Sequence, residues 1–193
     1  METLIIATHN AGKAAEINRL LEGKYEVKSL KDLGYHEEIV EDGDSFKANA
    51  LIKARTIFEK FGKPCFADDS GLEVDALDGA PGVYSARFAG EPSDDTANNQ
   101  LLLEKLEGNS DRHAQFRTVI AYIDGGGKEQ FFTGIARGSL LTSLTGDQGF
   151  GYDPLFLPEG ETRTFAQMSK DEKNRISHRG IAINHLISYL ANQ

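Results

Sequence analysis

The chain has 193 residues, of which 39% are hydrophobic and 26% charged, and its formal net charge is −9. This length and balance predict one substantial globular domain or two lobes that share a core. The acidic charge argues against nucleic acid as a partner, because nucleic-acid binders usually carry a basic face, and the single cysteine, Cys65, excludes an intrachain disulfide and a thiolate metal cluster.

Strand, loop and helix alternate in the first third of the chain. The apolar run over residues 3–8 predicts a buried strand, and the helix that follows the next loop has an apolar face. A second helix is predicted over residues 44–61, with Asp44 or Ser45 as its cap. This alternation favours an α/β arrangement.

The middle of the chain predicts a further strand, a helix and a hairpin. Residues 63–68 read as a strand, and a glycine-rich stretch follows as far as Gly90. Residues 94–106 predict a helix with acidic residues in its first turn. Two β-rich runs at residues 113–123 and 128–137 predict a hairpin, because a glycine-rich turn joins them.

The last part of the chain predicts two helical segments. Ser169-Lys170-Asp171-Glu172 is a capping-box pattern, and an amphipathic pattern begins at Gly180. No apolar run approaches the ~20 residues that a bilayer span needs, and the first residues lack the basic and apolar regions of a secretory signal. We therefore expect a cytoplasmic protein with no membrane partner.

The segment Thr8-His9-Asn10-Ala11-Gly12-Lys13 lies between a predicted strand and a predicted helix. The N-terminus of a helix exposes free N–H groups and a partial positive charge, so it can bind an anion. Gly12 would let the backbone approach a phosphate, and Lys13 supplies a point charge. The spacing is not that of a Walker A loop. An ordinary turn capped by Asn10 is the alternative.

The carboxylates of the segment Asp68-Asp69-Ser70-Gly71 repel each other unless they are solvated, hydrogen-bonded or share a cation. The segment follows a predicted strand, which is where α/β sheets usually carry functional groups. Hard oxygen ligands of this kind suit Mg²⁺. One member of an acidic cluster before the second predicted helix could complete such a site, although a solvated surface explains most of that cluster. Its members are Glu37, Glu38, Glu41, Asp42 and Asp44.

Two further segments have the composition of a nucleotide site. The loop at residues 146–154 carries Phe150 and Tyr152 among glycines, and an aromatic ring on such a loop can stack on a planar base. The segment at residues 173–180 places three cations and a histidine in an otherwise acidic chain. A plain turn and a solvated helix end are the alternatives.

Taken together, these segments resemble the Ham1/RdgB/ITPA family, whose members remove non-standard purine nucleoside triphosphates. They occur in the family's order from residue 8 to residue 180. The matching residues are Thr8-His9-Asn10-Ala11-Gly12-Lys13, Phe46, Asn49-Ala50, Lys53-Ala54, Ala67-Asp68-Asp69-Ser70-Gly71-Leu72, Gly79-Ala80-Pro81-Gly82-Val83-Tyr84-Ser85-Ala86-Arg87-Phe88, Gly149-Phe150-Gly151-Tyr152-Asp153-Pro154-Leu155-Phe156 and Ile176-Ser177-His178-Arg179-Gly180.

The resemblance implies an α/β fold with an elongated mixed sheet, flanking helices and two lobes around a central substrate cleft, similar to that of the Maf proteins. Residues 1–193 would form this single two-lobed domain, usually as a homodimer. The implied reaction is the Mg²⁺-dependent hydrolysis of ITP, dITP or XTP to the monophosphate and pyrophosphate, which cleanses the nucleotide pool.

The resemblance also implies a role for individual residues. Asp69 would accept a proton, and Glu41 with Asp69 would bind Mg²⁺. Lys53 would help the segment at residues 8–13 to hold the triphosphate. The remaining substrate contacts would come from Ser70, Phe150, Gly151, Tyr152, Asp153, Lys173, His178 and Arg179.

Two positions depart from the family pattern, and two other functions compete. His9 stands where relatives often carry a smaller residue, and Ala48 stands where an acidic residue is common. A Maf-like pyrophosphatase would act on other nucleotides, but Ser177-His178-Arg179-Gly180 favours the Ham1 reading. A regulator that senses a triphosphate without cleaving it is the alternative outside enzymes, and Asp68-Asp69 with Lys13 argues against it.

Overall fold

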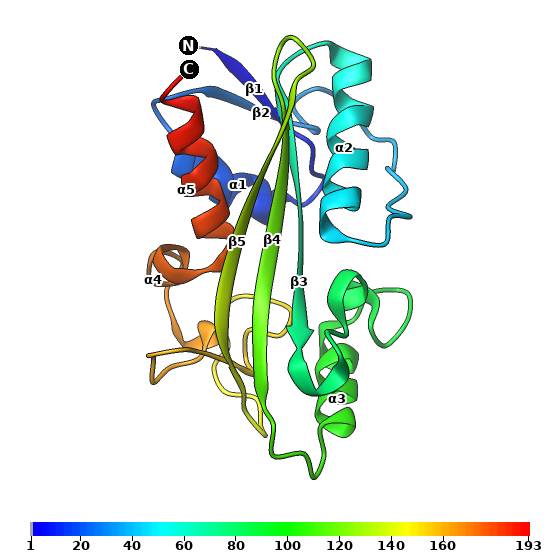
Figure 1. Cartoon of the computed structure of the whole chain (residues 1–193), viewed down its shortest axis with the longest axis vertical. Coiled ribbons are helices and arrows are strands. Elements are labelled where there is room, and N and C mark those ends of the chain that lie inside the picture. The colour runs from blue at the N-terminus through cyan, green and yellow to red at the C-terminus, as the bar shows by residue number, and fades with distance from the viewer. Residues whose placement is uncertain (1) are drawn as a thin grey trace. The chain divides into compact units, whose positions relative to one another are not determined.

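The computed structural model describes residues 2–193 and contains one mixed six-stranded sheet of order β2-β1-β3-β4-β5-β6 (Figure 1). β1 is parallel to β2 and β3, whereas β5 and β6 are antiparallel. The predicted α/β class with a mixed sheet is therefore confirmed. The strands are β1 (Thr3–Ile6), β2 (Glu26–Ser29), β3 (Cys65–Val74), β4 (His113–Ile123), β5 (Glu129–Leu140) and β6 (Phe156–Pro158).

Side chains cap the starts of α2, α3 and α4. Ser45, rather than Asp44, accepts a hydrogen bond from the backbone at the start of α2, and Asp94 does the same for α3. Ser169 and Glu172 form the predicted capping box of α4. The helices are α1 (Ala11–Leu21), α2 (Phe46–Phe61), α3 (Asp95–Lys105), α4 (Lys170–Ile176) and α5 (His178–Leu190), with short 3-10 helices at Asp75–Leu77, Gly82–Arg87 and Phe165–Gln167.

The chain forms two compact units, each built from separate segments. Unit 1 runs up to Asp69 and includes Val119–Thr133 and the end of the chain from Ala182, and unit 2 consists of Ser70–Thr118 and Gly134–Ile181. The single two-lobed domain over residues 1–193, with its central cleft, stays a prediction. None of the helices within residues 2–193 has the length and apolar character that a bilayer span requires.

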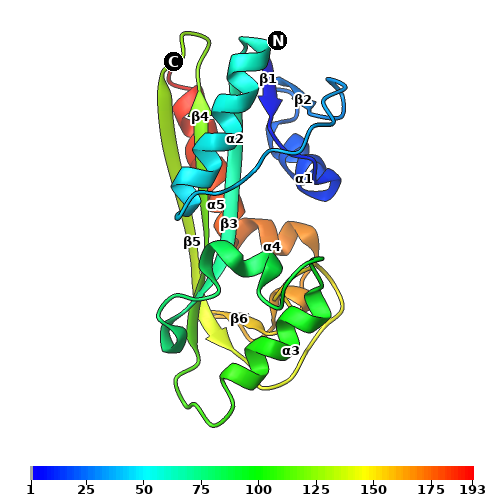
Figure 2. The same cartoon turned by 90° about the vertical axis from the view of Figure 1, so that its right-hand side faces the viewer.

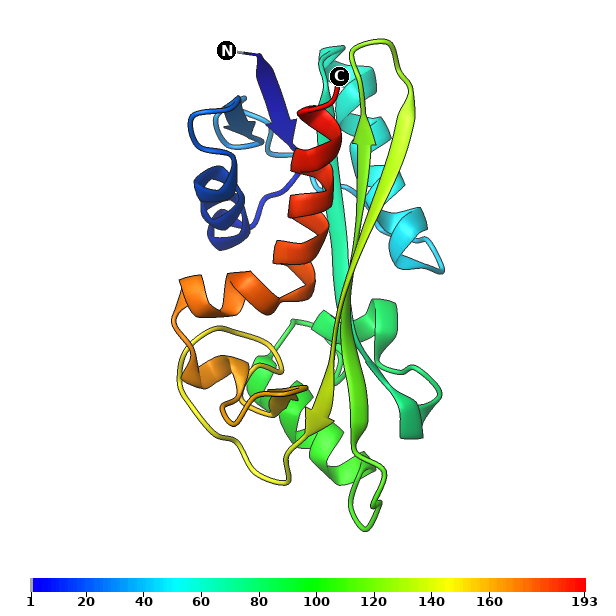
Figure 3. The same ribbon diagram turned by 60° about the vertical axis from the view of Figure 1, so that its left-hand side comes forward.

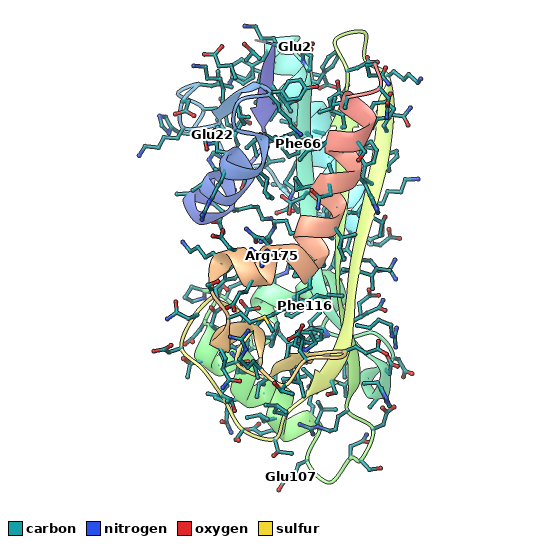
Figure 4. All side chains as sticks on the ribbon, turned by 90° about the vertical axis from the view of Figure 1, so that its left-hand side faces the viewer. Glu2, Glu22, Phe66, Glu107, Phe116 and Arg175 are labelled. Atoms are coloured by element: carbon teal, nitrogen blue, oxygen red, sulfur yellow. The ribbon has the colours of Figure 1, made fainter. Side chains whose placement is uncertain are left out.

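Unit 1 has helices on both faces of its strands. Ile5 and Cys65 pack with α2 in one core cluster, and Leu4 and Phe66 pack with α1 and α5 in another, because successive strand residues point to opposite faces. Figure 2 shows α2 along the strands, Figure 3 shows α1 and α5, and Figure 4 labels Phe66.

Unit 2 has an aromatic core. The ring centroid of Phe116 on β4, labelled in Figure 4, lies 4.7 Å from that of Phe156 on β6 and 4.7 Å from that of His178. The Phe165 ring stacks on Phe116 at 5.9 Å and is tilted against Phe156 at 5.1 Å. Leu102 of α3 is fully buried in the same cluster. The core thus fixes the start of α5, where His178 lies.

The expected end of β3 is wrong. The strand was predicted over residues 63–68, with the acidic segment after it, but β3 continues to Val74 and contains Asp68 and Asp69. The polar residues end the apolar run, whereas the strand continues because its neighbour β4 pairs with it along the sheet. Strands β2 and β6, of four and three residues, were not predicted because such short segments show no period.

Candidate functional site

Residues 8–13 run from the loop after β1 into the first turn of α1 in unit 1, and this helix begins with a regular N-cap. Oδ1 of Asn10 accepts a hydrogen bond from the backbone N–H of Lys13 at 2.9 Å, and Oγ1 of Thr8 accepts one from the N–H of Asn10 at 3.1 Å. The side chains from His9 to Gly12 are exposed, and the first turn of α1 carries no acidic residue. This helix end can therefore bind an anion.

His9 joins this loop to the segment that carries the acidic cluster. Its Nε2 lies 2.8 Å from the carbonyl oxygen of Glu37, and its ring stacks on Tyr35 with centroids 5.9 Å apart. The unusual histidine therefore has a local structural role in unit 1.

Two lysines face three carboxylates in unit 1. Nζ of Lys13 lies 2.9 Å from Oδ2 of Asp68, whose side chain is buried. Nζ of Lys53 lies 2.7 Å from Oε1 of Glu41 and 4.0 Å from Oδ1 of Asp69, and it donates to the carbonyl oxygen of Asp68 at 2.6 Å. Burial lowers the pKa of Lys53, but the three carboxylates together raise it by more than burial lowers it. The pKa of Lys53 therefore lies above its ordinary value.

Asp69 has the electrostatic character of a general base. Burial raises the pKa of Asp69 to about 6, against the attraction of Lys53 and Lys13, and the charge of Glu41 raises it further. A hydrogen bond from the Asn49 side chain favours the ionised form. Within residues 2–193, its Oδ2 is buried with no hydrogen-bond partner, which is costly for a carboxylate oxygen.

The residues of unit 1 fit a divalent cation of the Mg²⁺ type. Glu41 and Asp69 already share one cation, the ammonium of Lys53, and Oδ2 of Asp69 has an unused acceptor position. The described residues contain no group of three or more carboxylate, histidine or cysteine ligands. A site with two carboxylates suits Mg²⁺, because this ion usually takes one or two protein carboxylates and completes its shell with water and substrate phosphates.

In unit 2, Asp153 fixes the loop that carries Phe150. Oδ2 of Asp153 accepts hydrogen bonds from Nζ of Lys173 at 2.7 Å and from the backbone N–H of Phe150 at 3.2 Å. A Cβ on Gly149 would lie 2.2 Å from the same oxygen, and its φ is +73°, so glycine is required there. The Phe150 ring is 55% exposed, with Nζ of Lys173 4.8 Å and the guanidinium of Arg179 5.8 Å from its centroid.

His178 and Arg179 occupy the first turn of α5 and are both buried. The His178 ring stacks on Phe116 with an interplanar angle of 12°. Ser177 joins α4 to α5, since its N–H donates to the carbonyl oxygen of Lys173 and its Oγ accepts from the N–H of Gly180 at 3.0 Å. The alternative for this segment was a solvated helix C-terminus, where a cation complements the macrodipole. Arg179 is instead buried at a helix N-terminus, where its charge opposes the macrodipole.

The other predicted contacts of unit 2 have partners within the protein. Oγ of Ser70 lies 2.8 Å from Oγ1 of Thr118. The hydroxyl of Tyr152 donates to the carbonyl oxygen of Ser85 at 2.6 Å, so the tyrosine is a structural anchor of its loop. Gly151 has backbone hydrogen bonds to α3.

A comparison with protein families matches residues 4–189 to the Ham1 family. The chain belongs to the Ham1 family. A dITP/XTP pyrophosphatase of Porphyromonas gingivalis is 51% identical over 191 residues, which cover 98% of each chain. Two solved structures are also similar, the Ham1 protein of Staphylococcus aureus (39% identity, TM-score 0.92, 99% of each chain) and that of Coxiella burnetii (37%, TM-score 0.93, all of each chain).

Membership of the Ham1 family confirms the resemblance inferred from the motifs. Unit 1 contains a charged cluster of Lys13, Lys53, Glu41 and Asp69. Unit 2 contains a second group, in which the charged side chains of Lys173 and Arg179 lie close to the Phe150 ring and Asp153 pairs with Lys173. Asn49, which donates a hydrogen bond to Asp69, has no role implied by the motifs. Its position four residues before Lys53 was a usable signal, because residues at this spacing lie on one helix face.

Proposed function

We propose that this protein hydrolyses non-standard purine nucleoside triphosphates such as ITP, dITP and XTP to the monophosphate and pyrophosphate. The observation that carries the proposal is Asp69, a half-buried carboxylate with a raised pKa and a buried, unpartnered oxygen beside two lysines. The names of the Ham1 relatives, dITP/XTP pyrophosphatases at about half identity to this chain, support the choice of substrate.

The phosphates are bound by unit 1 in this proposal. The free N–H groups at the start of α1 and the ammonium of Lys13 neutralise phosphate oxygens, with Lys53 as a second cation. Such preorganised positive groups are the main source of catalysis in phosphoryl transfer. Both lysines are held by carboxylates, so little side-chain entropy is lost when the substrate binds.

Asp69 takes a proton from the attacking water as the water oxygen bonds to the α-phosphorus. The bond from the α-phosphorus to the bridging oxygen breaks, and that oxygen leaves with pyrophosphate. A pKa of about 6 leaves this carboxylate ionised near neutral pH while it remains a stronger base than an exposed aspartate. Glu41 and Asp69 would hold Mg²⁺, which supplies charge neutralisation on the phosphate oxygens when bound. The hydrogen bond from Asn49 and the ammonium of Lys53 orient the Asp69 carboxylate.

The purine is bound by unit 2 in this proposal. The exposed Phe150 ring offers a face on which a base can stack, and Arg179 with Lys173 lies close to that ring. A donor such as the Arg179 guanidinium, or a backbone N–H of residues 150–153, can pair with the 6-oxo group of hypoxanthine or xanthine. Opposite the 6-amino group of adenine, the same donor would be buried and unpaired, which allows rejection by ~10⁴ or more.

The proposal also includes the setting in which the enzyme works. We place it in the cytoplasm as a homodimer of a single two-lobed domain, as the family resemblance implies. Light scattering on a sizing column would measure the mass of the particle, and the mass of one chain would contradict the dimer.

The test is an assay of the purified protein with Mg²⁺ and, separately, ITP, dITP, XTP, GTP and ATP. Pyrophosphate and monophosphate are both measured, and the proposed reaction releases them in a 1:1 ratio. A phosphatase that removes the terminal phosphate would instead release orthophosphate and the nucleoside diphosphate. We expect fast release from the first three substrates and little from GTP and ATP. Tight nucleotide binding without release would favour a sensor, and equal turnover of ATP and ITP would refute the selectivity.

A further inference from the structure

Two side chains of α3 bind the peptide groups on both sides of Gly151. Oδ2 of Asp95 accepts a hydrogen bond from the N–H of Gly151 at 2.8 Å, and Nδ2 of Asn99 donates to the carbonyl oxygen of Gly151 at 2.9 Å. The same Nδ2 donates to the carbonyl oxygen of Asp95 at 2.8 Å. The two residues are one helical turn apart, so they grip the glycine from one helix face (α3 is labelled in Figure 2).

The helix itself does not need these contacts. Asp94 is the N-cap of α3, since its Oδ1 accepts from the N–H of Ala97 at 3.1 Å. The Asp95 carboxylate is exposed and reaches away from its own helix to a loop 56 residues later in the chain. Asn99 is buried, at 4% exposure. These hydrogen bonds therefore act on the loop rather than on the helix end.

Gly151 is held in the aromatic loop through its backbone rather than through a side chain. Its φ is +60°, and a Cβ there would meet nothing within 4 Å, so packing does not restrain it. Phe150 precedes it, and the exposed Phe150 ring lies close to Lys173 and Arg179. The direction of the ring thus depends on how the peptide groups on both sides of Phe150 are held. Asp153 holds both of them, since its Oδ2 accepts from the N–H of Phe150 and its N–H donates to the carbonyl oxygen of Phe150 at 3.2 Å, and the α3 side chains add the contacts to Gly151.

We propose that Asp95 and Asn99 are positioning residues that hold Phe150 in the orientation needed to stack on the purine. This inference rests on the proposed function, because it assigns Phe150 to the base. We call the hydrogen bonds of Asp95 and Asn99 to Gly151 the clamp. Loss of the clamp lets the Phe150 ring sample other orientations, so part of its stacking on the purine is lost. The residues that would bind phosphate and accept the proton belong to unit 1, whereas Asp95, Asn99 and Gly151 belong to unit 2.

The experiment compares Asp95→Ala with Asp94→Ala. Asp94 and Asp95 are adjacent exposed carboxylates at the N-cap and the first position of the same helix, so both variants remove one negative charge from the same helix end. Asp94→Ala removes the helix cap and leaves the loop alone, whereas Asp95→Ala leaves the cap and releases Gly151. Asp95→Asn is the conservative variant, because its amide oxygen can still accept from the Gly151 N–H.

Steady-state kinetics with ITP give KM and kcat for each variant, and inorganic tripolyphosphate is used as a competitive inhibitor that has no base. In Asp95→Ala we expect KM to rise roughly tenfold, the effect of one hydrogen bond to a charged group, with kcat within about twofold. The inhibition constant of tripolyphosphate should stay unchanged. Asp94→Ala should keep the wild-type KM despite a lower melting temperature, and Asp95→Asn should recover most of the affinity.

An unchanged KM in Asp95→Ala would overturn the proposal, and so would an equal rise in Asp94→Ala, which would point to the helix alone. A tripolyphosphate constant that changes with KM would also overturn it, because the defect would not depend on the base. If the wild-type protein releases no pyrophosphate from ITP, the proposed function fails by itself. Calorimetric titration with ITP then compares the same variants, and an equal affinity in all of them, or no binding in any, would reject the clamp.

Discussion

Nζ of Lys173 lies 2.7 Å from Oδ2 of Asp153, and both side chains are almost fully buried. Burial raises the pKa of Asp153, whereas the charge and hydrogen bond of Lys173 lower it. The pair therefore stabilises the fold only while both partners are present. Because the same oxygen accepts from the N–H of Phe150, this ion pair also fixes the aromatic loop.

We expect Lys173→Met to lower the free energy of unfolding by about 3–5 kcal/mol at neutral pH, because it leaves the Asp153 carboxylate buried without its counter-ion. The loss should shrink in acid, where Asp153 can take up a proton. Lys170→Met, at an exposed position of the same helix, is the control and should change little. Urea unfolding at pH 7 and pH 5 measures both, and equal stability of the two variants would contradict a role for the pair.

Gly149→Ala should damage the same loop from the backbone side. The new Cβ would lie 2.2 Å from Oδ2 of Asp153, and φ at this position is +73°. We expect a loss of about 3–5 kcal/mol, comparable with the loss of the ion pair. Gly160→Ala is the matched control, because its φ is +78° but a Cβ there meets nothing within 4 Å.

The control should therefore lose only the cost of the left-handed backbone, about 1–2 kcal/mol. Thermal or urea unfolding of the two variants gives the comparison. If Gly160→Ala is as unstable as Gly149→Ala, backbone strain explains both and the close approach to Asp153 contributes nothing.

Asp69→Asn should abolish turnover, largely spare nucleotide binding and stabilise the protein. The pKa of Asp69 is raised from 3.8 to about 6, so the folded protein binds this proton more tightly than the unfolded chain does. The ionised carboxylate therefore opposes folding, with a cost that is absent below pH 3.8, grows as the pH rises towards 6 and is constant above it.

Removal of this charge should add about 1–3 kcal/mol to the free energy of unfolding at pH 7 and almost nothing near pH 4. The measurement is urea unfolding in EDTA, so that no divalent cation stabilises the carboxylate. Asp42→Asn, which removes the same charge from an exposed side chain of unit 1, should show no such gain. A stable variant that still turns over ITP would disprove the assignment of Asp69 as base.

Local signals in the sequence predicted the elements well. The caps at Ser45 and Ser169 were predictable, because capping depends on only three or four neighbouring residues. The predicted end of β3 is wrong for the same reason. Polar residues at Asp68 and Asp69 end the local apolar run, but pairing with β4 continues the strand. Strand pairing depends on residues far away in the sequence.

The candidate site was predictable as a set of residues but not as a set of contacts. Motifs selected Lys13, Glu41 and Asp69, yet no spacing could indicate that Lys53 lies between two of these carboxylates. Unit 2 shows the same limit, because the hydrogen bonds of Asp95 to the loop arise only once α3 packs in the core. Such long-range contacts also determine the pKa of each buried group.

Phe150→Ala should weaken the binding of the purine and leave the binding of the phosphates unchanged. The ring is 55% exposed, so its removal costs little core packing. Stacking of a base on an aromatic side chain contributes about 1–3 kcal/mol, which corresponds to a rise in KM for ITP of roughly 5- to 150-fold. Leu144→Ala, at a similarly exposed side chain of unit 2, is the control.

Phe150→Trp adds the only tryptophan of the chain, and its fluorescence should be quenched by ITP but not by inorganic tripolyphosphate. Equal quenching by both would mean that Phe150 senses the phosphates, and the purine would then have to bind elsewhere.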